Sequence, residues 1–463
     1  MTSQPKYIEI VDYIVNNASK GTFKKGSRLP SIRELATQFE CSKATVIRAF
    51  DELEDRHIIY SVPQSGYYMV DSLSKKTDSV SQLFDLIDFS AAAPEIDLLP
   101  YKDFQHCINQ AIDLHKDILF NYSDTQGLPS LRKTLSKQLM TSQVFKKPDD
   151  IFITSGSQQA LYLLAVMPFP NGKTNILVEQ PVYSSFLKIL ELNGITAVGI
   201  SRYAEGFDTD QLENLFKTGN IKFFYTIPRF HNPTGYSLSN IQKKEIARLA
   251  CKYNVYIVED DYLADLDQSS KNDPVMTYDE GEKIIYIKSF SKTLLPGLRI
   301  GYVILPRLLH NKFLDYKRCM DINSSVLSQG ALDIYFDNGM YEAHIDKARM
   351  TYVDRMKHLE NALERHKLIK SDTANSSCGF FKMLELPEHI DAKILSHKLW
   401  EKNVVIKDAG PYYLQDFYKQ NHVRISIFRT DKSKIDSGIK EIAAEIDNMN
   451  RSVPVKKKNY PDF

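Results

Sequence analysis

The sequence predicts a multi-domain protein: a small, mainly helical N-terminal domain with a two-stranded β wing, and a large α/β domain with a mainly parallel sheet. Its 463 residues exceed the size of one ordinary domain. The first seventy residues show three amphipathic segments followed by two short β-rich runs. From Leu86 onward, short β-rich runs alternate with amphipathic helices, which is typical of a parallel sheet covered on both faces.

Composition narrows the class of protein. Hydrophobic residues make up 43% and charged residues 25%, as in a soluble globular protein, and the net charge is +1. Any contact with nucleic acid therefore needs a local basic patch. The five cysteines lie far apart without metal-ligand spacing, so we expect reduced thiols and no metal site. We find neither a signal peptide nor an apolar run of the ~18 residues that a membrane helix needs, and expect a cytoplasmic location.

We place the domain boundaries by pattern. Residues 4–72 form the first domain, and 73–85 form a linker rich in Ser, Asp and Lys. The strand and helix alternation covers 86–448, with strand-like runs at 150–154, 175–178, 223–227, 255–258 and 284–287. Residues 449–463 are a basic tail, which we interpret as a solvated end rather than a contact with DNA.

The first domain has clear helix signals. An apolar face (Ile8, Val11, Ile14 and Val15) predicts the first helix. Ser31 and Glu34 form a capping box that starts the second helix. Ser42 is the expected N-cap of the third helix, which places Val46, Phe50 and Leu53 inward. The range 58–70, interrupted by a turn at 63–66, predicts the wing.

Two helices joined by a tight turn and followed by a wing form a winged helix-turn-helix. Lys43, Thr45 and Arg48 lie on the outward face near the start of the third helix, the end that enters the major groove in this motif. Arg33 can reach a phosphate. The acidic stretch 51–55 lies at the far end of the same helix. A small helical bundle with solvated charges is the alternative.

The segments 26–36 and 41–46 resemble the signature of the GntR family of regulators. The sequence departs from the family at Ile47, where many relatives carry a basic residue, and at His57, which replaces a common glycine. The resemblance implies a partner, double-stranded operator DNA, and contacts to it at Arg33, Ser42, Lys43, Thr45 and around Gly66.

Lys292 is the first of several candidates for cofactor chemistry in the large domain. It follows Ser289 and Ser291 closely and precedes Arg299. A buried lysine with a depressed pKa is a Schiff-base nucleophile for an aldehyde cofactor, and the two hydroxyls with the guanidinium can bind a phosphate. A surface loop is the alternative.

A second motif covers residues 154–161. A strand ends there, Gly156 permits a tight turn, and a helix begins whose free amides at 155–158 form an anion site. A third motif places Asp260 and Tyr262 after the apolar strand at 255–258, where ligands bind in open α/β sheets. Asp260 can pair with a pyridinium nitrogen, and Tyr262 can bind the ring hydroxyl. Both motifs also fit loops without a ligand.

Three further residues complete the set. Asn232 stands in a Pro-Gly turn that would present its amide to the same ring hydroxyl. Tyr183 can stack on the ring or serve as a core tyrosine. Arg424 lies in an otherwise apolar strand, where a guanidinium is costly unless it meets an anion. A substrate carboxylate and a protein carboxylate are the two alternatives for that anion.

Together these motifs resemble the fold-type I, class I aminotransferases over about residues 86–447. The resemblance implies pyridoxal 5′-phosphate on Lys292, with Asp260 at the ring nitrogen and Asn232 and Tyr262 at the ring hydroxyl. Tyr122 resembles the residue that reaches a neighbouring subunit's phosphate, which implies a homodimer. The phosphate ligands implied are Ser155, Gly156, Ser157, Gln158, Ser289, Ser291 and Arg299.

A GntR head on an aminotransferase body is the MocR arrangement. We therefore expect a regulator that senses an amine or amino acid through an external aldimine with the cofactor. A working aminotransferase with a DNA-binding module and a sensor of pyridoxal phosphate itself remain alternatives. Near 379–381 the sequence is more similar to true aminotransferases than to many MocR relatives, which leaves the selectivity for the effector open.

Overall fold

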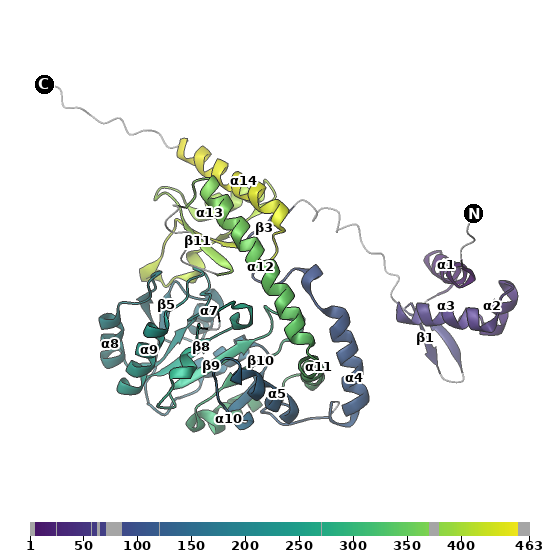
Figure 1. Cartoon of the computed structure of the whole chain (residues 1–463), viewed down its shortest axis with the longest axis horizontal. Coiled ribbons are helices and arrows are strands. Elements are labelled where there is room, and N and C mark those ends of the chain that lie inside the picture. The colour runs from purple at the N-terminus through teal and green to yellow at the C-terminus, as the bar shows by residue number, and fades with distance from the viewer. Residues whose placement is uncertain are drawn as a thin grey trace. The chain divides into compact units, whose positions relative to one another are not determined.

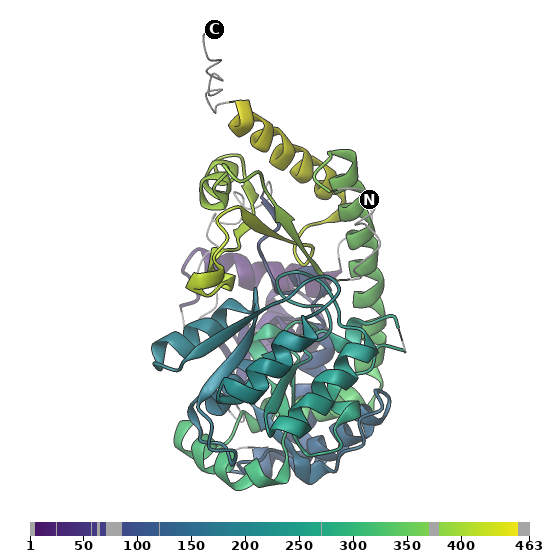
Figure 2. The ribbon, with the colours of Figure 1, turned by 90° about the vertical axis from the view of Figure 1, so that its left-hand side faces the viewer.

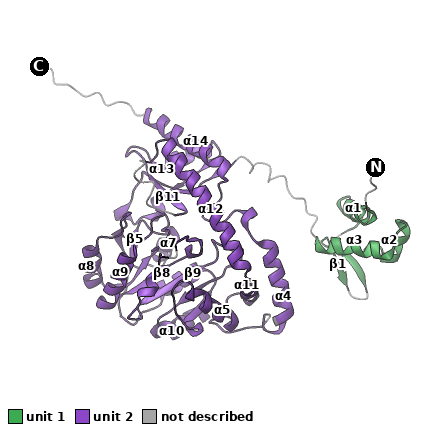
Figure 3. Cartoon of the chain, viewed as in Figure 1, with its two compact units in different colours: residues 1–85 green, residues 86–463 purple. Residues whose placement is uncertain are grey.

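The computed structural model of the chain describes residues 5–24, 26–56, 58–62, 65–70, 86–119, 121–269, 271–369 and 379–451. The chain divides into two compact units, Met1–Asp85 and Leu86–Phe463 (Figure 3). The predicted linker 73–85, His57 and the tail beyond residue 451 lie outside the described residues.

Unit 1 contains three helices, α1 (Lys6–Ser19), α2 (Ile32–Gln38) and α3 (Lys43–Asp55). The predicted capping box is confirmed, because Ser31 accepts from the Glu34 amide and Glu34 accepts from the Ser31 amide. Ser42 caps α3 as expected, and Val46, Phe50 and Leu53 are buried. The predicted face of α1 needs a correction: Ile10 is buried with Val11 and Ile14, whereas Ile8 and Val15 are only half-buried.

The wing contains β1 (Ile59–Val62) and β2 (Gly66–Met69), paired antiparallel. The segment 26–29 runs along the other edge of β2: Gly26 donates to the Met69 carbonyl and Leu29 donates to the Tyr67 carbonyl. The sequence did not predict this third edge. Gly66 has a φ of +117° and the side chain of Arg28 lies against it, so this position requires glycine.

Unit 2 is built on a seven-stranded sheet in the order β4-β10-β9-β8-β7-β5-β6. Figure 1 labels β5, β8, β9 and β10 of this sheet. All neighbouring strands are parallel except β10, which is antiparallel to β4 and β9. The predicted mainly parallel sheet is confirmed, whereas β6 and β10 were not predicted. The strands are β4 (Ile151–Thr154), β5 (Asn175–Gln180), β6 (Ala197–Ser201), β7 (Ile221–Thr226), β8 (Tyr256–Asp260), β9 (Ile284–Ser289) and β10 (Gly301–Ile304).

Helices pack on this sheet and on one another. The helix α6 contacts β4, β9 and β10, and α9 contacts β8, while α4 packs along α11. Figures 1 and 2 show α12 running from the C-terminal layer to α11 along one side of the unit. The helices are α4 (Tyr101–Leu119), α5 (Pro129–Met140), α6 (Ser157–Val166), α7 (Ser184–Leu192), α8 (Thr209–Thr218), α9 (Asn240–Tyr253), α10 (His310–Met320), α11 (Val326–Asp337) and α12 (Met340–Arg365).

A smaller C-terminal layer completes the unit. Its three-stranded antiparallel sheet has the order β11-β14-β13, and β12 pairs with β3 in a separate parallel ladder. Among the helices that the structure describes, none is long and apolar enough to cross a membrane. The elements are β3 (Ile87–Asp88), β11 (Phe381–Glu385), α13 (Ala392–Trp400), β12 (Val404–Val405), β13 (Lys407–Asp408), β14 (His422–Ser426) and α14 (Lys432–Arg451).

Candidate cofactor site

A cavity of about 140 Å³ lies where β7, β8 and β9 end. Parallel neighbours bring their carboxyl ends to one edge of the sheet, so three motifs distant in sequence meet there. Ser155, Gly156, Tyr122 and Arg424 are the predicted cofactor or substrate residues that do not line it. The lining consists of Ser157, Gln158, Tyr183, Ile227, Asn232, Asp260, Tyr262, Ser289, Ser291, Lys292 and Arg299.

Asp260 presents a free acceptor in this cavity. The side chain is only 4% exposed, and the Tyr225 hydroxyl donates to Oδ2 at 2.9 Å. Its other oxygen, Oδ1, is buried without a hydrogen-bond partner among the described residues. Burial raises the pKa of Asp260 to about 7. A cationic ring N–H would satisfy Oδ1 and hold the carboxyl ionised, so the site fits a pyridinium nitrogen.

Lys292 is the amine of the cavity. Burial, together with the positive charges of Arg424 and Arg299, lowers the pKa of Lys292 to about 8, although Asp260 opposes the shift. A lysine with this pKa has a sizeable fraction of free amine near neutral pH, in contrast to a solvated lysine. The amine can therefore attack an aldehyde without a strong base to remove its proton first.

Arg299 and Gly156 lie against one another beside the cavity. Gly156 has a φ of +80° and precedes α6, whose first amides are free to bind an anion. A Cβ on Gly156 would lie 2.8 Å from Nη2 of Arg299, so glycine permits the guanidinium to approach the helix. Arg299 also donates to Oγ of Ser291 at 3.4 Å and to the Ser155 carbonyl at 3.2 Å.

Ser155 lies behind the cavity rather than in its lining. Its amide donates to Gln159 at 2.8 Å and its hydroxyl donates to Asp321 at 3.1 Å. Both of its donors are therefore already used by the protein. The neighbouring residues Ser157 and Gln158 do face the cavity, and Gln158 donates to the Tyr183 hydroxyl at 3.2 Å.

Tyr262 and Asn232 also line the cavity. The Tyr262 hydroxyl donates to the Phe230 carbonyl at 3.0 Å, so the phenol is tied to the loop after β7. Oδ1 of Asn232 accepts from Nη1 of Arg424 at 3.2 Å, which orients the amide group. The NH₂ group of Asn232 is then the donor available to a ring oxygen.

Arg424 reaches the site from β14 and is 4% exposed. Its guanidinium bonds the Asn232 side chain and the Ser90 carbonyl and lies over the rings of Phe381 and Tyr412, at 4.8 and 5.5 Å. All four partners are neutral, and Nε is buried without a partner among the described residues. A buried guanidinium without a carboxylate is costly, so this position fits an anionic ligand.

Two contributors were missed by sequence reasoning. Tyr225 lies inside a strand that looks like apolar core, and Ser90 belongs to a segment far from every motif. The pairing of β7 with β8 places Tyr225 opposite Val258, two residues before Asp260. Only the strand order could have revealed this neighbour. Tyr122 is 84% exposed and does not line the cavity of its own chain.

The predicted DNA contacts of the N-terminal unit lie on α2, at the start and in the middle of α3, and at the start of β2. Lys43 is exposed, and Thr45 shares a 2.9 Å hydrogen bond with Ser42. Arg33 is also exposed on α2. Arg48, by contrast, lies over the ring of Tyr7 at 4.2 Å. Arg48 is nevertheless exposed, as predicted, and its guanidinium contacts α1 from the surface.

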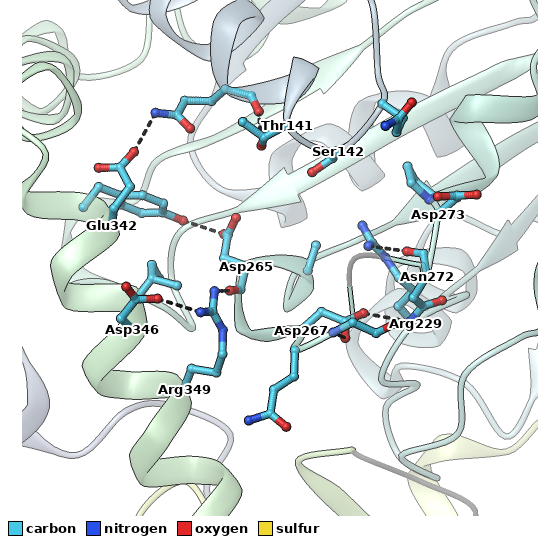
Figure 4. Close-up of a pocket in the computed structure, with 18 residues that line it drawn as sticks. Thr141, Ser142, Arg229, Asp265, Asp267, Asn272, Asp273, Glu342, Asp346 and Arg349 are labelled. Atoms are coloured by element: carbon cyan, nitrogen blue, oxygen red, sulfur yellow. Dashed lines mark hydrogen bonds and ion pairs between the residues drawn. The ribbon is translucent and has the colours of Figure 1, made fainter.

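A larger polar cavity of about 680 Å³ lies elsewhere in unit 2 (Figure 4). Several of its polar groups already have partners: Arg349 contacts Asp346, and Asp265 accepts from Tyr341 and from Lys288, which does not line the cavity. None of its described lining residues is a lysine. It thus offers no amine for an aldehyde, and the smaller cavity remains the candidate site.

Two family models match the chain: aminotransferase class I and II over residues 85–442, and bacterial regulatory proteins of the gntR family over residues 6–69. Among curated relatives, YcxD of Bacillus subtilis, an uncharacterized HTH-type transcriptional regulator, is 46% identical, covering 95% of this chain and all of the relative. The HTH-type transcriptional regulator NorG of Staphylococcus aureus is 27% identical, covering 86% of this chain and 95% of NorG.

Unit 2 is similar to solved structures of aminotransferases. The kynurenine aminotransferase of Pyrococcus horikoshii matches with a TM-score of 0.72 and 28% identity, over 81% of this chain and 96% of that one. The multiple substrate aminotransferase of Thermococcus profundus matches with a TM-score of 0.72 and 26% identity, over 82% and 97%.

Proposed function

Because this chain belongs to the aminotransferase class I and II family and carries a gntR-family unit ahead of it, the MocR arrangement, we propose that it is a pyridoxal phosphate-dependent transcription regulator. The observation that carries the proposal is that Lys292 and the free oxygen of Asp260 lie in one cavity. The two relatives above are both named as transcriptional regulators, which favours the same role for this chain.

Pyridoxal phosphate would supply an aldehyde that condenses with primary amines and a ring that withdraws electrons. Lys292 would hold it, because its lowered pKa leaves free amine near neutral pH. Asp260 would keep a proton on the ring nitrogen through Oδ1. Arg299 and the amides that begin α6 would bind the phosphate. Asn232 would donate to the ring oxygen.

The effector we propose is a primary amine, and in particular an amino acid. Arg424 would bind its carboxylate through the guanidinium face that now meets only neutral groups. A carboxylate would also satisfy Nε, which is buried without a partner among the described residues. An amino acid would then contact both the cofactor and β14. Its binding would therefore favour one arrangement of the central sheet relative to the C-terminal layer.

Operator DNA is the partner that we propose for unit 1, with Lys43 and Thr45 facing the major groove and Arg33 contacting a phosphate. A cytoplasmic homodimer is expected through unit 2. In its support, Tyr101, Leu114 and Ile118 are exposed along α4, as is Tyr122 shortly after that helix. Exposed apolar side chains gathered on one element are typical of an interface.

A working aminotransferase is the second candidate. It is favoured by the pKa of Lys292, which suits a general base as well as a nucleophile. The sensor and the enzyme differ in one measurable respect, since only the enzyme releases a keto acid.

The experiment is a visible-absorbance titration of the purified protein with a panel of amines and amino acids, followed by product analysis and by binding to duplexes selected from a random library. We expect a cofactor band that shifts with an amino acid, no keto acid, and altered DNA affinity. Turnover would favour the enzyme. A protein that remains colourless when pyridoxal phosphate is supplied would refute both functions.

A further inference from the structure

Glu179 and His231 are buried in contact with one another beside the cavity without lining it. Nε2 of His231 lies 2.9 Å from Oε2 of Glu179, and both side chains are 0% exposed. Glu179 is on β5, whereas His231 belongs to the loop after β7. The functions proposed above use neither residue. Burying two ionisable groups has a high desolvation cost, so a role that needs this geometry is worth seeking.

Glu179 ties the end of β7 to that loop. The Thr226 hydroxyl donates to Oε1 at 2.9 Å, and the Ile227 amide donates to Oε2 at 3.0 Å. Burial raises the pKa of Glu179, but the nearby His231 and Arg202 outweigh it, and the pKa lies below its ordinary value. Arg202 is itself buried and follows β6. The carboxylate thus stays ionised and accepts from strand and loop together.

His231 passes this constraint to the turn that carries Asn232. Its Nδ1 shares a 2.8 Å hydrogen bond with the Thr234 hydroxyl. Its amide donates to the Tyr236 carbonyl at 2.9 Å, and its carbonyl accepts from the Gly235 amide at 2.6 Å. The side chain and the backbone of His231 therefore both form hydrogen bonds that hold the turn in place. Asn232 is the next residue in the chain.

The opposite side of the turn is packed equally closely. A Cβ on Gly235 would lie 2.2 Å from the Phe381 carbonyl on β11. Asn232 in turn accepts from Arg424 on β14. The turn is therefore held between the Glu179 carboxylate on one side and the C-terminal sheet on the other, and a change on either side would move Asn232.

We propose that Glu179 and His231 are a positioning pair that sets the orientation of Asn232 and, through it, of Arg424. Through this pair, two contacts depend on one another: that of Asn232 with the cofactor ring oxygen and that of Arg424 with an effector carboxylate. This inference rests on the proposed cofactor function and names two residues through which that site is organised.

Glu179→Gln tests the proposal. The amide removes the charge and replaces one acceptor oxygen with a donor, while the side chain keeps its size. His231→Gln is the second variant, since it retains an N–H donor but loses the link to Thr234. Glu213→Gln is the matched control, because Glu213 likewise accepts from a hydroxyl, that of Tyr253, and pairs with a basic side chain, Lys252, at 2.6 Å, but away from the cavity.

The readouts are the pH midpoint of the bound cofactor's visible band and the ratio of affinities for L-alanine and ethylamine. If the Asn232 amide moves away from the ring oxygen, that oxygen keeps more negative charge. The nitrogen that joins Lys292 to the cofactor lies beside it and then holds its proton more tightly. Glu179→Gln is expected to move the midpoint to higher pH and to reduce the alanine preference by about tenfold, the effect of losing one charge-assisted hydrogen bond. Arg424→Lys should also reduce the preference, because it removes the carboxylate contact itself.

His231→Gln should change both readouts in the same direction and to a smaller extent, and it decides the question if Glu179→Gln does not fold. If the variants bind the cofactor with the same pH midpoint and the same preference for L-alanine as the parent protein, the positioning role is wrong. The proposed function is then unaffected. A parent protein without a visible band would instead refute the proposed function.

Discussion

Arg424 and Asn232 are joined by a 3.2 Å hydrogen bond between Nη1 and Oδ1, although 192 residues separate them in the chain. One belongs to β14 of the C-terminal layer and the other to the turn after β7 of the central sheet. The Asn232 amide, which lines the cavity, therefore also contacts the Arg424 guanidinium, which is available to a carboxylate. This bond connects the two layers of unit 2 at the site itself.

Asp260→Asn is predicted to stabilise the cofactor-free protein at pH 8. The native pKa of about 7 exceeds that of an unfolded aspartate, so the native state binds the extra proton and loses stability as pH rises toward 7. Asparagine removes this cost and can still accept from Tyr225. Urea unfolding should show a gain of about 2–4 kcal/mol at pH 8. The gain should shrink markedly at pH 4, and an equal gain at both values would contradict the assignment.

Cofactor loading is predicted to accelerate with rising pH through about 8. Only the free amine of Lys292 attacks an aldehyde, and its pKa of about 8 sets the fraction of that form. Stopped-flow absorbance after addition of pyridoxal phosphate measures the rate. Lys292→Ala should abolish the stable band, and borohydride should fix the cofactor mass on Lys292 in the parent. A rate that is flat between pH 6 and pH 9 would show that Lys292 is not the nucleophile.

Most of the central sheet could be predicted because its strands are buried on both faces and appear as continuous apolar runs. The short strand β10 was missed, since its four residues follow directly on the Lys292 and Arg299 motif and lack a run of their own. The same reasoning located the cavity residues, because each local motif ends a strand at the same edge of the sheet.

Contacts across the fold could not be predicted in this way. Arg48 resembles an outward residue of α3, but its partner Tyr7 lies on α1, and only tertiary packing brings them together. Tyr225 and Ser90 likewise act through neighbours that are distant in sequence. Glu179 and His231 were not singled out, since a single acid in a strand and a histidine before a turn have no pattern that distinguishes them from structural residues.

Arg33→Ala and Thr45→Ala are predicted to weaken DNA binding in different ways. The loss of a phosphate contact at Arg33 should lower affinity for all sequences and reduce the salt slope by about one unit. The loss of a base contact at Thr45 should relax specificity at one position by about 1–3 kcal/mol. Fluorescence anisotropy at several salt concentrations separates the two. If alanine at Arg33, Lys43 and Thr45 together leaves affinity unchanged, α3 is not the recognition helix.

Arg48→Ala is predicted to affect folding more than DNA binding. The guanidinium stacks on Tyr7, and an exposed cation–π contact contributes about 0.5–1 kcal/mol. The urea midpoint of the N-terminal transition should fall accordingly, while operator affinity changes less than in Thr45→Ala. A loss of affinity larger than that of Thr45→Ala, without loss of stability, would assign Arg48 to the DNA surface instead.

Arg424→Lys is predicted to retain cofactor binding and to lose most of the response to amino acids. The aldehyde of the cofactor accepts almost any primary amine, so Lys292 alone cannot select a ligand. Selectivity needs a second contact at a fixed distance from the amine, and a bidentate guanidinium supplies it at about 1.5–3 kcal/mol. Lysine keeps the charge but loses the two parallel donors and the stacking on Phe381.

The measurement is again the spectral titration, with each amino acid compared with the amine that lacks its carboxylate. In the parent the amino acid should bind more tightly, and in Arg424→Lys and Arg424→Ala the two should converge, because the difference arises at the carboxylate. Only a ligand that distinguishes two conformations can alter DNA binding, so the same variants should also lose the amino acid's effect on operator affinity. If both variants respond like the parent, Arg424 is a structural arginine and the effector is recognised elsewhere.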